Sequence, residues 1–228
     1  MEVRRPCDYK YILFDLDGTL TDSFPGISRC VQYALAKFGL LEADQSMLLK
    51  FCGPPLMDSF QNLYGFSYED AARATAYYRE EYMDKGILEN DVYEGIPELL
   101  AALKASGRKI LLATSKPESM AYTVLNHFRL TDYFDTITGA SLRDDVRHSK
   151  ADVIRETMAR QGISAEEQDQ VLMVGDRKYD VAGALACGLD CLGVYYGYAE
   201  PGELETAGAV YTVQTVAELK CALLGEDA

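Results

Sequence analysis

The chain has 228 residues, of which 48% are hydrophobic and 25% are charged, as in an ordinary globular protein with a sizeable core. Its 22 Lys and Arg residues against 36 Asp and Glu residues give a net charge of −14, which argues against nucleic-acid backbones and anionic membranes as partners. No apolar run is long enough for a signal peptide or for a membrane span, so we expect a cytoplasmic protein.

Apolar runs alternate with segments of helical periodicity along most of the chain. This alternation is typical of a parallel sheet covered by helices, and it predicts an α/β fold. The predicted strands lie at about 11–14, 109–113, 134–138, 171–174, 191–195 and 209–212. The predicted helices lie near 96–105, 117–128, 150–161, 179–187, 201–206 and 215–223.

The alternation stops between Asp22 and Tyr93, where the sequence predicts helices and no convincing strand. These helices are expected at about 25–38, 43–50, 55–64 and 68–85. The first opens at Pro25 and is placed to end at Gly39, which follows the usual preference for Pro at a helix start and Gly at its end. Gly and Pro occur at both ends of this helical segment, where the chain enters it and leaves it, and this suits a two-stranded hinge.

A pair of carboxylates, Asp15 and Asp17, directly follows the first predicted strand and precedes Gly18-Thr19. Such a pair can hold a hard cation, or it can act on phosphorus as nucleophile and proton donor. A solvated turn is the alternative for an acidic run that stands alone. An EF-hand calcium loop is excluded, because it needs Gly at its sixth position and Glu at its twelfth, whereas here Gly18 is fourth and Gly26 is twelfth.

The segment Thr114-Ser115-Lys116-Pro117-Glu118 follows a predicted strand. Ser115, with Glu118 three residues later and Pro117 between them, has the pattern of a capping box. Helix-start amides at a sheet edge favour an anion, and the Thr114 hydroxyl could bind a phosphoryl oxygen there. The alternative is that these residues only cap a helix, which explains Ser115 and Glu118 but leaves Thr114 without a role.

Lys150 follows Ser149, a suitable N-cap, so it lies in the first turn of its predicted helix. A cation there opposes the helix dipole by about 0.3–1 kcal/mol, so Lys150 is mildly misplaced as a surface residue. From the residues alone, a solvated lysine remains the alternative. Asp176 ends an apolar strand after Gly175, and Asp180 would face the same place from the following helix.

Four segments in this order resemble the motifs of the haloacid dehalogenase-like (HAD) hydrolases. They are Asp15-x-Asp17-Gly18-Thr19, Leu111–Ser115, Ser149–Ile154 and Val171–Asp180. Each motif alone is weak, but four in order are specific, and the resemblance spans nearly the whole chain. It implies a Rossmann-like parallel sheet sandwiched by helices as catalytic core, residues 1–21 and 94–228, with an inserted all-helical cap domain at 22–93.

The resemblance also implies roles for single residues. Asp15 is expected as the nucleophile that forms an aspartyl-phosphate, and Asp17 as the general acid/base. Lys150 is expected to bridge nucleophile and phosphate. The expected Mg²⁺ ligands are Asp15, the backbone carbonyl of Asp17, Asp176 and, directly or through another group, Asp180. Phosphate or substrate contacts are expected from Gly18, Thr19, Thr114, Ser115, Gly53 and Pro54.

The function implied is that of a Mg²⁺-dependent phosphatase of a small phosphate monoester, similar to phosphoglycolate phosphatases. The alternatives are a 5′-nucleotidase, a β-phosphoglucomutase-like phosphoryl transfer and, in a different class, a non-enzymatic binding protein, which four intact motifs disfavour. Asp17 argues against the dehalogenase branch, whose motif lacks this carboxylate. We expect a small phosphorylated metabolite as partner, no nucleic-acid polymer, no membrane, and a monomer or homodimer.

Several residues are left with two interpretations. Arg177 and Lys178 either neutralise the carboxylates or are solvated. Tyr195, Tyr196 and Tyr198 either border the pocket or simply pack. The six cysteines contain no Cys-x-x-Cys pair, and with only two histidines no zinc-site spacing emerges, so we expect buried free thiols.

Overall fold

The computed structural model describes residues 4–141 and 149–225, so that His148 lies outside the described residues. The chain divides into two compact units, one of residues 1–21 and 92–228 and the other of residues 22–91. Where the chain crosses between them, β2 (Thr21–Asp22) and β3 (Asp91–Val92) pair as a two-stranded sheet. Each of these strands has only two residues, too few to show the alternation of apolar and polar residues by which a strand is recognised in a sequence.

The larger unit contains a six-stranded sheet in the order β5-β4-β1-β6-β7-β8, in which every pair is parallel. This confirms the predicted fold class. Since β1 lies between β4 and β6, the residues that follow it emerge at the middle of the carboxyl edge of the sheet. The strands are β1 (Tyr11–Phe14), β4 (Lys109–Pro117), β5 (Thr136–Ala140), β6 (Val171–Gly175), β7 (Asp190–Val194) and β8 (Tyr211–Val213).

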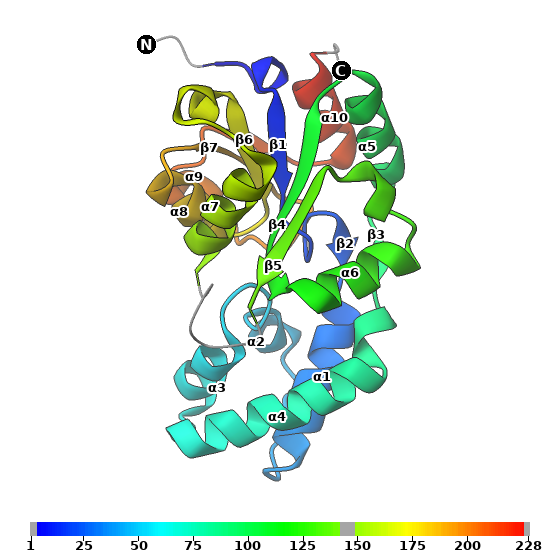
Figure 1. Ribbon diagram of the computed structural model, residues 1–228. Helices are drawn as coiled ribbons and strands as arrows, with labels where there is room; N and C mark the ends of the chain where they lie inside the picture. The colour runs from blue at the N-terminus through cyan, green and yellow to red at the C-terminus, as the bar shows by residue number, and fades with distance from the viewer. Residues whose placement is uncertain (1–3, 142–148, 226–228) are drawn as a thin grey trace. The chain divides into compact units, whose positions relative to one another are not determined.

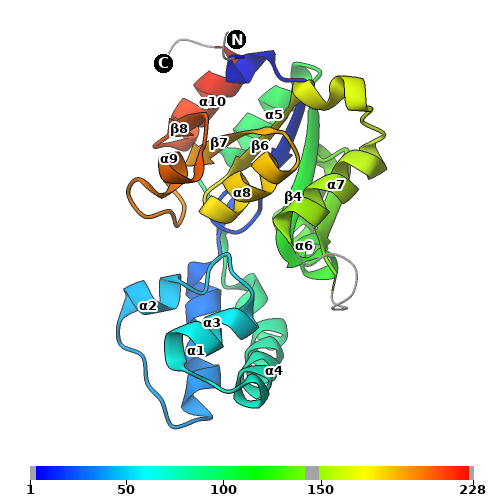
Figure 2. The same cartoon turned by 90° about the vertical axis from the view of Figure 1, so that its left-hand side faces the viewer.

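Helices cover both faces of this sheet (Figures 1 and 2). On one face, α7 (Lys150–Gln161) packs on β4 and β5, and α8 (Lys178–Ala186) packs on β6 and β7. On the other face lie α5 (Ile96–Ala105) and α10 (Val216–Leu224), which contact each other. Among the described residues of this unit, the other α-helices are α6 (Glu118–His127) and the short α9 (Glu203–Ala207), and short 3-10 helices lie at Pro6–Asp8, Thr131–Tyr133 and Ala165–Gln170.

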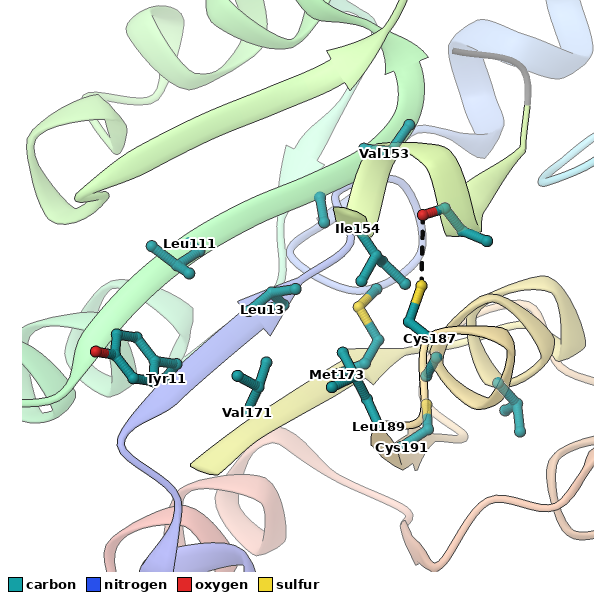
Figure 3. Close-up of a cluster of buried hydrophobic side chains, with 14 of the residues drawn as sticks. Tyr11, Leu13, Leu111, Val153, Ile154, Val171, Met173, Cys187, Leu189 and Cys191 are labelled. Atoms are coloured by element: carbon teal, nitrogen blue, oxygen red, sulfur yellow. Dashed lines mark hydrogen bonds between the residues drawn. The ribbon is translucent and has the colours of Figure 1, made fainter. Parts of the chain in front are cut away.

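A buried apolar layer lies between the sheet and the helices α7 and α8 (Figure 3). Alternate strand residues fill it, because successive side chains of a strand point to opposite faces. Tyr11 and Leu13 belong to this layer, and the same alternation directs Asp15 toward α7. Labelled members of the cluster are Tyr11, Leu13, Leu111, Val153, Ile154, Val171, Met173, Cys187, Leu189 and Cys191.

The inserted unit is built from helices, as predicted: α1 (Phe24–Ala36), α2 (Gln45–Leu49), α3 (Leu56–Tyr64) and α4 (Tyr68–Asp84). The apolar stripe of α1 is buried, and the chain turns at Gly39 with a φ of +72°. Arg29 on α1 pairs with Glu81 on α4 and with Glu89, and these ion pairs tie the helices of this unit together.

The six cysteines all lie in the described part of the chain and form no disulfide. Cys30, Cys52, Cys187 and Cys191 are buried as expected. Cys7 and Cys221 are partly exposed, so the expectation of buried thiols is wrong for these two. Within the described residues, no helix combines the length and apolarity that crossing a bilayer requires.

Candidate active site

Asp15 lies just beyond β1, and its carboxylate is held in one orientation. Oδ1 of Asp15 accepts a hydrogen bond from the backbone N–H of Leu16 at 2.8 Å and lies 2.9 Å from Nζ of Lys150. Thr114 lies near enough to this carboxyl group to lower its pKa. The Leu16 amide and the Lys150 ammonium therefore restrict its rotation.

Lys150 is buried in the first turn of α7, although a cation there opposes the helix dipole. Its Nζ lies 2.9 Å from Asp15 and 2.7 Å from Asp180, and it donates to the carbonyl oxygen of Ala113 at 3.0 Å. Burial lowers the pKa of Lys150, but Asp15 and Asp180 raise it by more, so the net direction is upward. Lys150 is therefore a permanent cation, and it is not the solvated lysine of the alternative interpretation.

Asp15, Asp176 and Asp180 form a tight acidic cluster, in which one oxygen from each lies within 4.8 Å of the others. The Asp176 and Asp180 side chains are buried. Burial, followed by the charges of Asp180 and Asp15, raises the pKa of Asp176 well above its ordinary value. Burial also raises the pKa of Asp15; Lys150 opposes this and Asp180 adds to it, and the net direction is upward.

These residues fit a divalent metal ion. The donor set is made of carboxylate oxygens, which hard cations such as Mg²⁺ prefer. Three clustered carboxylates carry more negative charge than the ammonium of Lys150 can balance, so a cation would offset what is left. Oδ2 of Asp180 accepts from the backbone N–H of Arg177 at 3.0 Å, whereas the buried Oδ1, although 2.7 Å from Nζ of Lys150, accepts no hydrogen bond from the described residues and is open to a metal ion.

Asp17 has a different partner from Asp15. Nζ of Lys116 lies 2.8 Å from Oδ1 of Asp17 and 2.7 Å from Oδ2, and the Lys116 side chain is buried. Sequence reasoning gave Lys116 no role. No regular alternation marks it in the sequence, because the register of β4 and β5 shifts between Thr114 and Pro117 and Lys116 lies in that stretch.

Gly18 and Thr19 form the turn that follows Asp17. The N–H of Gly18 donates to the carbonyl of Thr21 at 2.8 Å, and that of Thr19 donates to the carbonyl of Leu16 at 3.2 Å. Because both amides already have backbone acceptors, a phosphate would have to share or replace these bonds. Their contact with phosphate stays a prediction.

The capping box predicted at Ser115 is wrong. β4 continues to Pro117, and α6 begins at Glu118 without a side-chain cap. Ser115 is exposed within the strand, and Glu118 instead accepts from the N–H of Gly139 at 3.3 Å. Pairing with β5, which reaches Pro117 opposite Ala140, prevails over the local cap. Phosphate binding by Thr114 and Ser115 stays a prediction.

The other candidates are placed as follows. Nε of Arg177 lies 2.9 Å from Glu203, and the ammonium of Lys178 lies 5.6 Å from the centre of the Tyr179 ring. Gly53, with a φ of +109°, and Pro54 lie in the turn between α2 and α3 of the inserted unit. A contact of these two residues with substrate stays a prediction.

A parallel α/β sheet with clustered carboxylates and a buried lysine at its carboxyl edge is typical of hydrolases that act with a hard cation. Comparison with known families agrees with this class. The sequence profile of the haloacid dehalogenase-like hydrolases matches residues 12–194. The chain belongs to this family, as the resemblance of its four motifs predicted.

Individual relatives cover most of the chain. A 5′-nucleotidase of Pseudomonas aeruginosa is 42% identical over 93% of this chain and 94% of its own length. Tyrosine-protein kinase PtkA of Mycobacterium tuberculosis is 37% identical over 93% of this chain and 72% of its own. Phosphoglycolate phosphatase 1 of P. aeruginosa is 33% identical, with 83% and 70% covered. The crystal structure of a predicted phosphatase from Clostridium acetobutylicum superposes with a TM-score of 0.89, at 46% identity, over 95% of this chain and 99% of that one.

Proposed function

We propose that this chain is a Mg²⁺-dependent phosphatase that hydrolyses a small phosphate monoester through an aspartyl-phosphate on Asp15. The observation that carries the proposal is that two carboxylates only two residues apart in the sequence have different surroundings. Asp15 faces the acidic cluster and Lys150, whereas Asp17 faces Lys116. Two carboxylates in different environments can take different roles, here nucleophile and acid/base.

The reaction has two steps. A carboxylate oxygen of Asp15 attacks phosphorus, the bond from phosphorus to the ester oxygen breaks, and Asp17 gives its proton to the departing alkoxide. Asp17 then accepts a proton from a water molecule that attacks phosphorus, which releases inorganic phosphate and restores the Asp15 carboxylate. Lys150 lies close enough to Asp15 to counter the charge of the phosphoryl oxygens.

Asp15 and Asp176 would hold the metal ion, together with the backbone carbonyl of Asp17. When bound, Mg²⁺ makes the phosphorus more electrophilic and lowers the repulsion among the carboxylates. Asp180 would contribute Oδ1, which accepts no hydrogen bond within the described part of the chain, while the Arg177 amide holds its Oδ2. The Leu16 amide and the Lys150 ammonium orient Asp15 in advance, which reduces the cost of reaching the reactive geometry.

The names of the relatives point to different substrates for the phosphoryl group. The 5′-nucleotidase and phosphoglycolate phosphatase relatives support a phosphomonoester as substrate. The kinase relative supports a second candidate, in which the phosphoryl group is transferred to a tyrosine hydroxyl. A β-phosphoglucomutase-like transfer, a cytoplasmic location, the absence of a nucleic-acid partner, and a monomer or homodimer stay predictions.

A panel of phosphate esters tests the proposal. We would measure phosphate release from 5′-AMP, 2-phosphoglycolate, glucose 1-phosphate and p-nitrophenyl phosphate, with Mg²⁺ and with EDTA. A parallel reaction with ATP and a tyrosine-containing peptide would detect kinase activity. We expect Mg²⁺-dependent release from at least one monoester, and its loss in Asp15→Asn. Asp132→Asn, an exposed carboxylate on the surface, is the matched control that should retain activity.

Hydrolysis that persists in EDTA would overturn the metal requirement. Substantial phosphate release by a folded Asp15→Asn variant would exclude Asp15 as nucleophile. Peptide phosphorylation without phosphate release from any ester would replace the phosphatase by the kinase candidate.

A further inference from the structure

The loop that follows β7, residues 195–198, reaches Asp176 by two separate routes. The backbone N–H of Tyr198 donates to Oδ2 of Asp176 at 2.9 Å. The Tyr196 hydroxyl donates to the carbonyl oxygen of Thr19 at 2.9 Å, and the Thr19 hydroxyl donates to Oδ1 of Asp176 at 3.2 Å. Both oxygens of Asp176 are thus held by groups that lie outside its own strand.

Glycine lets this loop come close to the carboxylate. A Cβ atom on Gly197 would lie 2.1 Å from the carbonyl oxygen of Gly18 and 2.5 Å from Cβ of Asp176. A Cβ atom on Gly18, whose φ is +83°, would lie 2.2 Å from Oδ2 of Asp176. Two loop backbones therefore pack against Asp176 with no room for a side chain.

Tyr196 is also fixed at its ring. The rings of Tyr196 and Tyr93 meet edge to face, with their centroids 5.1 Å apart. The neighbouring Tyr195 differs, because its hydroxyl contacts Glu205 and accepts from the N–H of Gly202 at 3.0 Å, away from the acidic cluster. Of these two adjacent tyrosines, Tyr196 is the one linked to Asp176.

We propose that Tyr196 is a positioning residue for the metal-binding carboxylate Asp176 and acts through Thr19. The inference rests on the proposed metal site. The Tyr196 hydroxyl holds the Thr19 carbonyl, which sets the turn from which the Thr19 hydroxyl reaches Asp176. Groups that orient a metal ligand in this way typically change metal affinity by about 10–100-fold when they are removed.

The test uses Mg²⁺ alone and needs no substrate. Tyr196→Phe removes one hydroxyl and keeps the ring on Tyr93. We expect the Kd for Mg²⁺, measured by titration calorimetry, to rise by about 10-fold, and the Mg²⁺-induced rise in Tm to shrink. Tyr195→Phe is the matched control and should bind Mg²⁺ as the wild type does. Without Mg²⁺, the two variants should melt at similar temperatures.

Thr19→Val examines the route of the effect, because it removes the hydroxyl that reaches Asp176. If Tyr196 acts through Thr19, the double variant should bind Mg²⁺ no more weakly than Thr19→Val alone. Equal Mg²⁺ affinity of the wild type and Tyr196→Phe would overturn the inference, as would losses that multiply in the double variant. A wild-type chain that binds no Mg²⁺ would overturn the proposed metal site itself, and the inference with it.

Discussion

Lys116 links the surroundings of the two carboxylates in the proposed reaction, Asp15 and Asp17. Its ammonium lies 2.7 and 2.8 Å from the two oxygens of Asp17, and its backbone N–H donates to the Thr114 hydroxyl at 3.2 Å. Thr114 in turn lies near enough to Asp15 to lower the pKa of its carboxyl group. One residue near the end of β4 therefore contacts both the proposed acid/base and a neighbour of the proposed nucleophile.

Lys116→Met should lower kcat with p-nitrophenyl phosphate by about 10²-fold, since Asp17 loses the group that fixes both of its oxygens. Steady-state kinetics measures this. Lys109→Met is the matched control from the far end of the same strand, where the ammonium lies 2.7 Å from Asp135. If the Lys116→Met variant were as active as the Lys109→Met variant, Asp17 would not need its ion pair with Lys116.

Asp17→Asn should slow turnover by about 10²–10⁴-fold, the usual range for a lost general acid/base. Mg²⁺ affinity should stay nearly unchanged, because the proposed metal contact of Asp17 is its backbone carbonyl. An alkyl phosphate should suffer more than p-nitrophenyl phosphate, because a poor leaving group needs the proton most. Equal losses on both substrates, together with weaker Mg²⁺ binding, would make the Asp17 side chain a metal ligand instead.

Asp176→Asn should stabilise the metal-free chain at neutral pH while it abolishes Mg²⁺ binding. Burial, with Asp180 and Asp15, raises the folded-state pKa of Asp176 well above 3.8. The folded chain therefore holds a proton that the unfolded chain has lost, and stability falls as pH rises from 3.8 through the folded-state pKa. Asparagine avoids this loss, because it carries no charge and can still bond Tyr198 and Thr19.

Urea unfolding in EDTA between pH 5 and pH 8 measures how Asp176 changes the stability of the metal-free chain. This range lies about one to four pH units above the ordinary pKa of Asp. The wild type should lose stability relative to Asp176→Asn as pH rises. With saturating Mg²⁺ the order should reverse, because only the wild type gains binding free energy. A wild type that is the more stable protein in EDTA at pH 7 would refute the prediction.

Ile154→Ala should lower the free energy of unfolding by about 2–5 kcal/mol. Ile154 is fully buried in the layer between α7 and the sheet (Figure 3). Truncation removes apolar contact and leaves a cavity that the parallel strands cannot close. Equilibrium urea unfolding gives the value, and the exposed Leu185→Ala on α8 serves as control. Similar losses in the two variants would contradict the role assigned to this layer.

The fold and most of the acidic cluster could be predicted because their signals are local. An apolar run that ends in Asp marks a buried strand and the carboxyl edge at once, as at Asp15 and Asp176. The role of Lys150 came from the motif resemblance, because its place after the N-cap Ser149 marks it only as mildly misplaced for a surface residue. These features depend on residues a few positions apart, which a single sequence displays.

The features that were missed depend on contacts between distant segments. The cap predicted at Ser115 failed because β5 pairs with β4 as far as Pro117, which keeps Ser115 in the strand. The register of these strands shifts between Thr114 and Pro117, and Lys116 lies within that irregular stretch. The link from Tyr196 to Thr19 likewise joins residues with no signal in either local sequence.

The position of Lys150 has a consequence for how the protein folds. Its ammonium finds partners in Asp15, in the Ala113 carbonyl and in Asp180, which come from the beginning, middle and later part of the chain. A core that closed around Lys150 before all three had arrived would contain a buried charge with missing partners, at a cost of several kcal/mol. Incomplete sheets are therefore penalised, and the same side chain that serves the chemistry makes assembly of the core more nearly all-or-none.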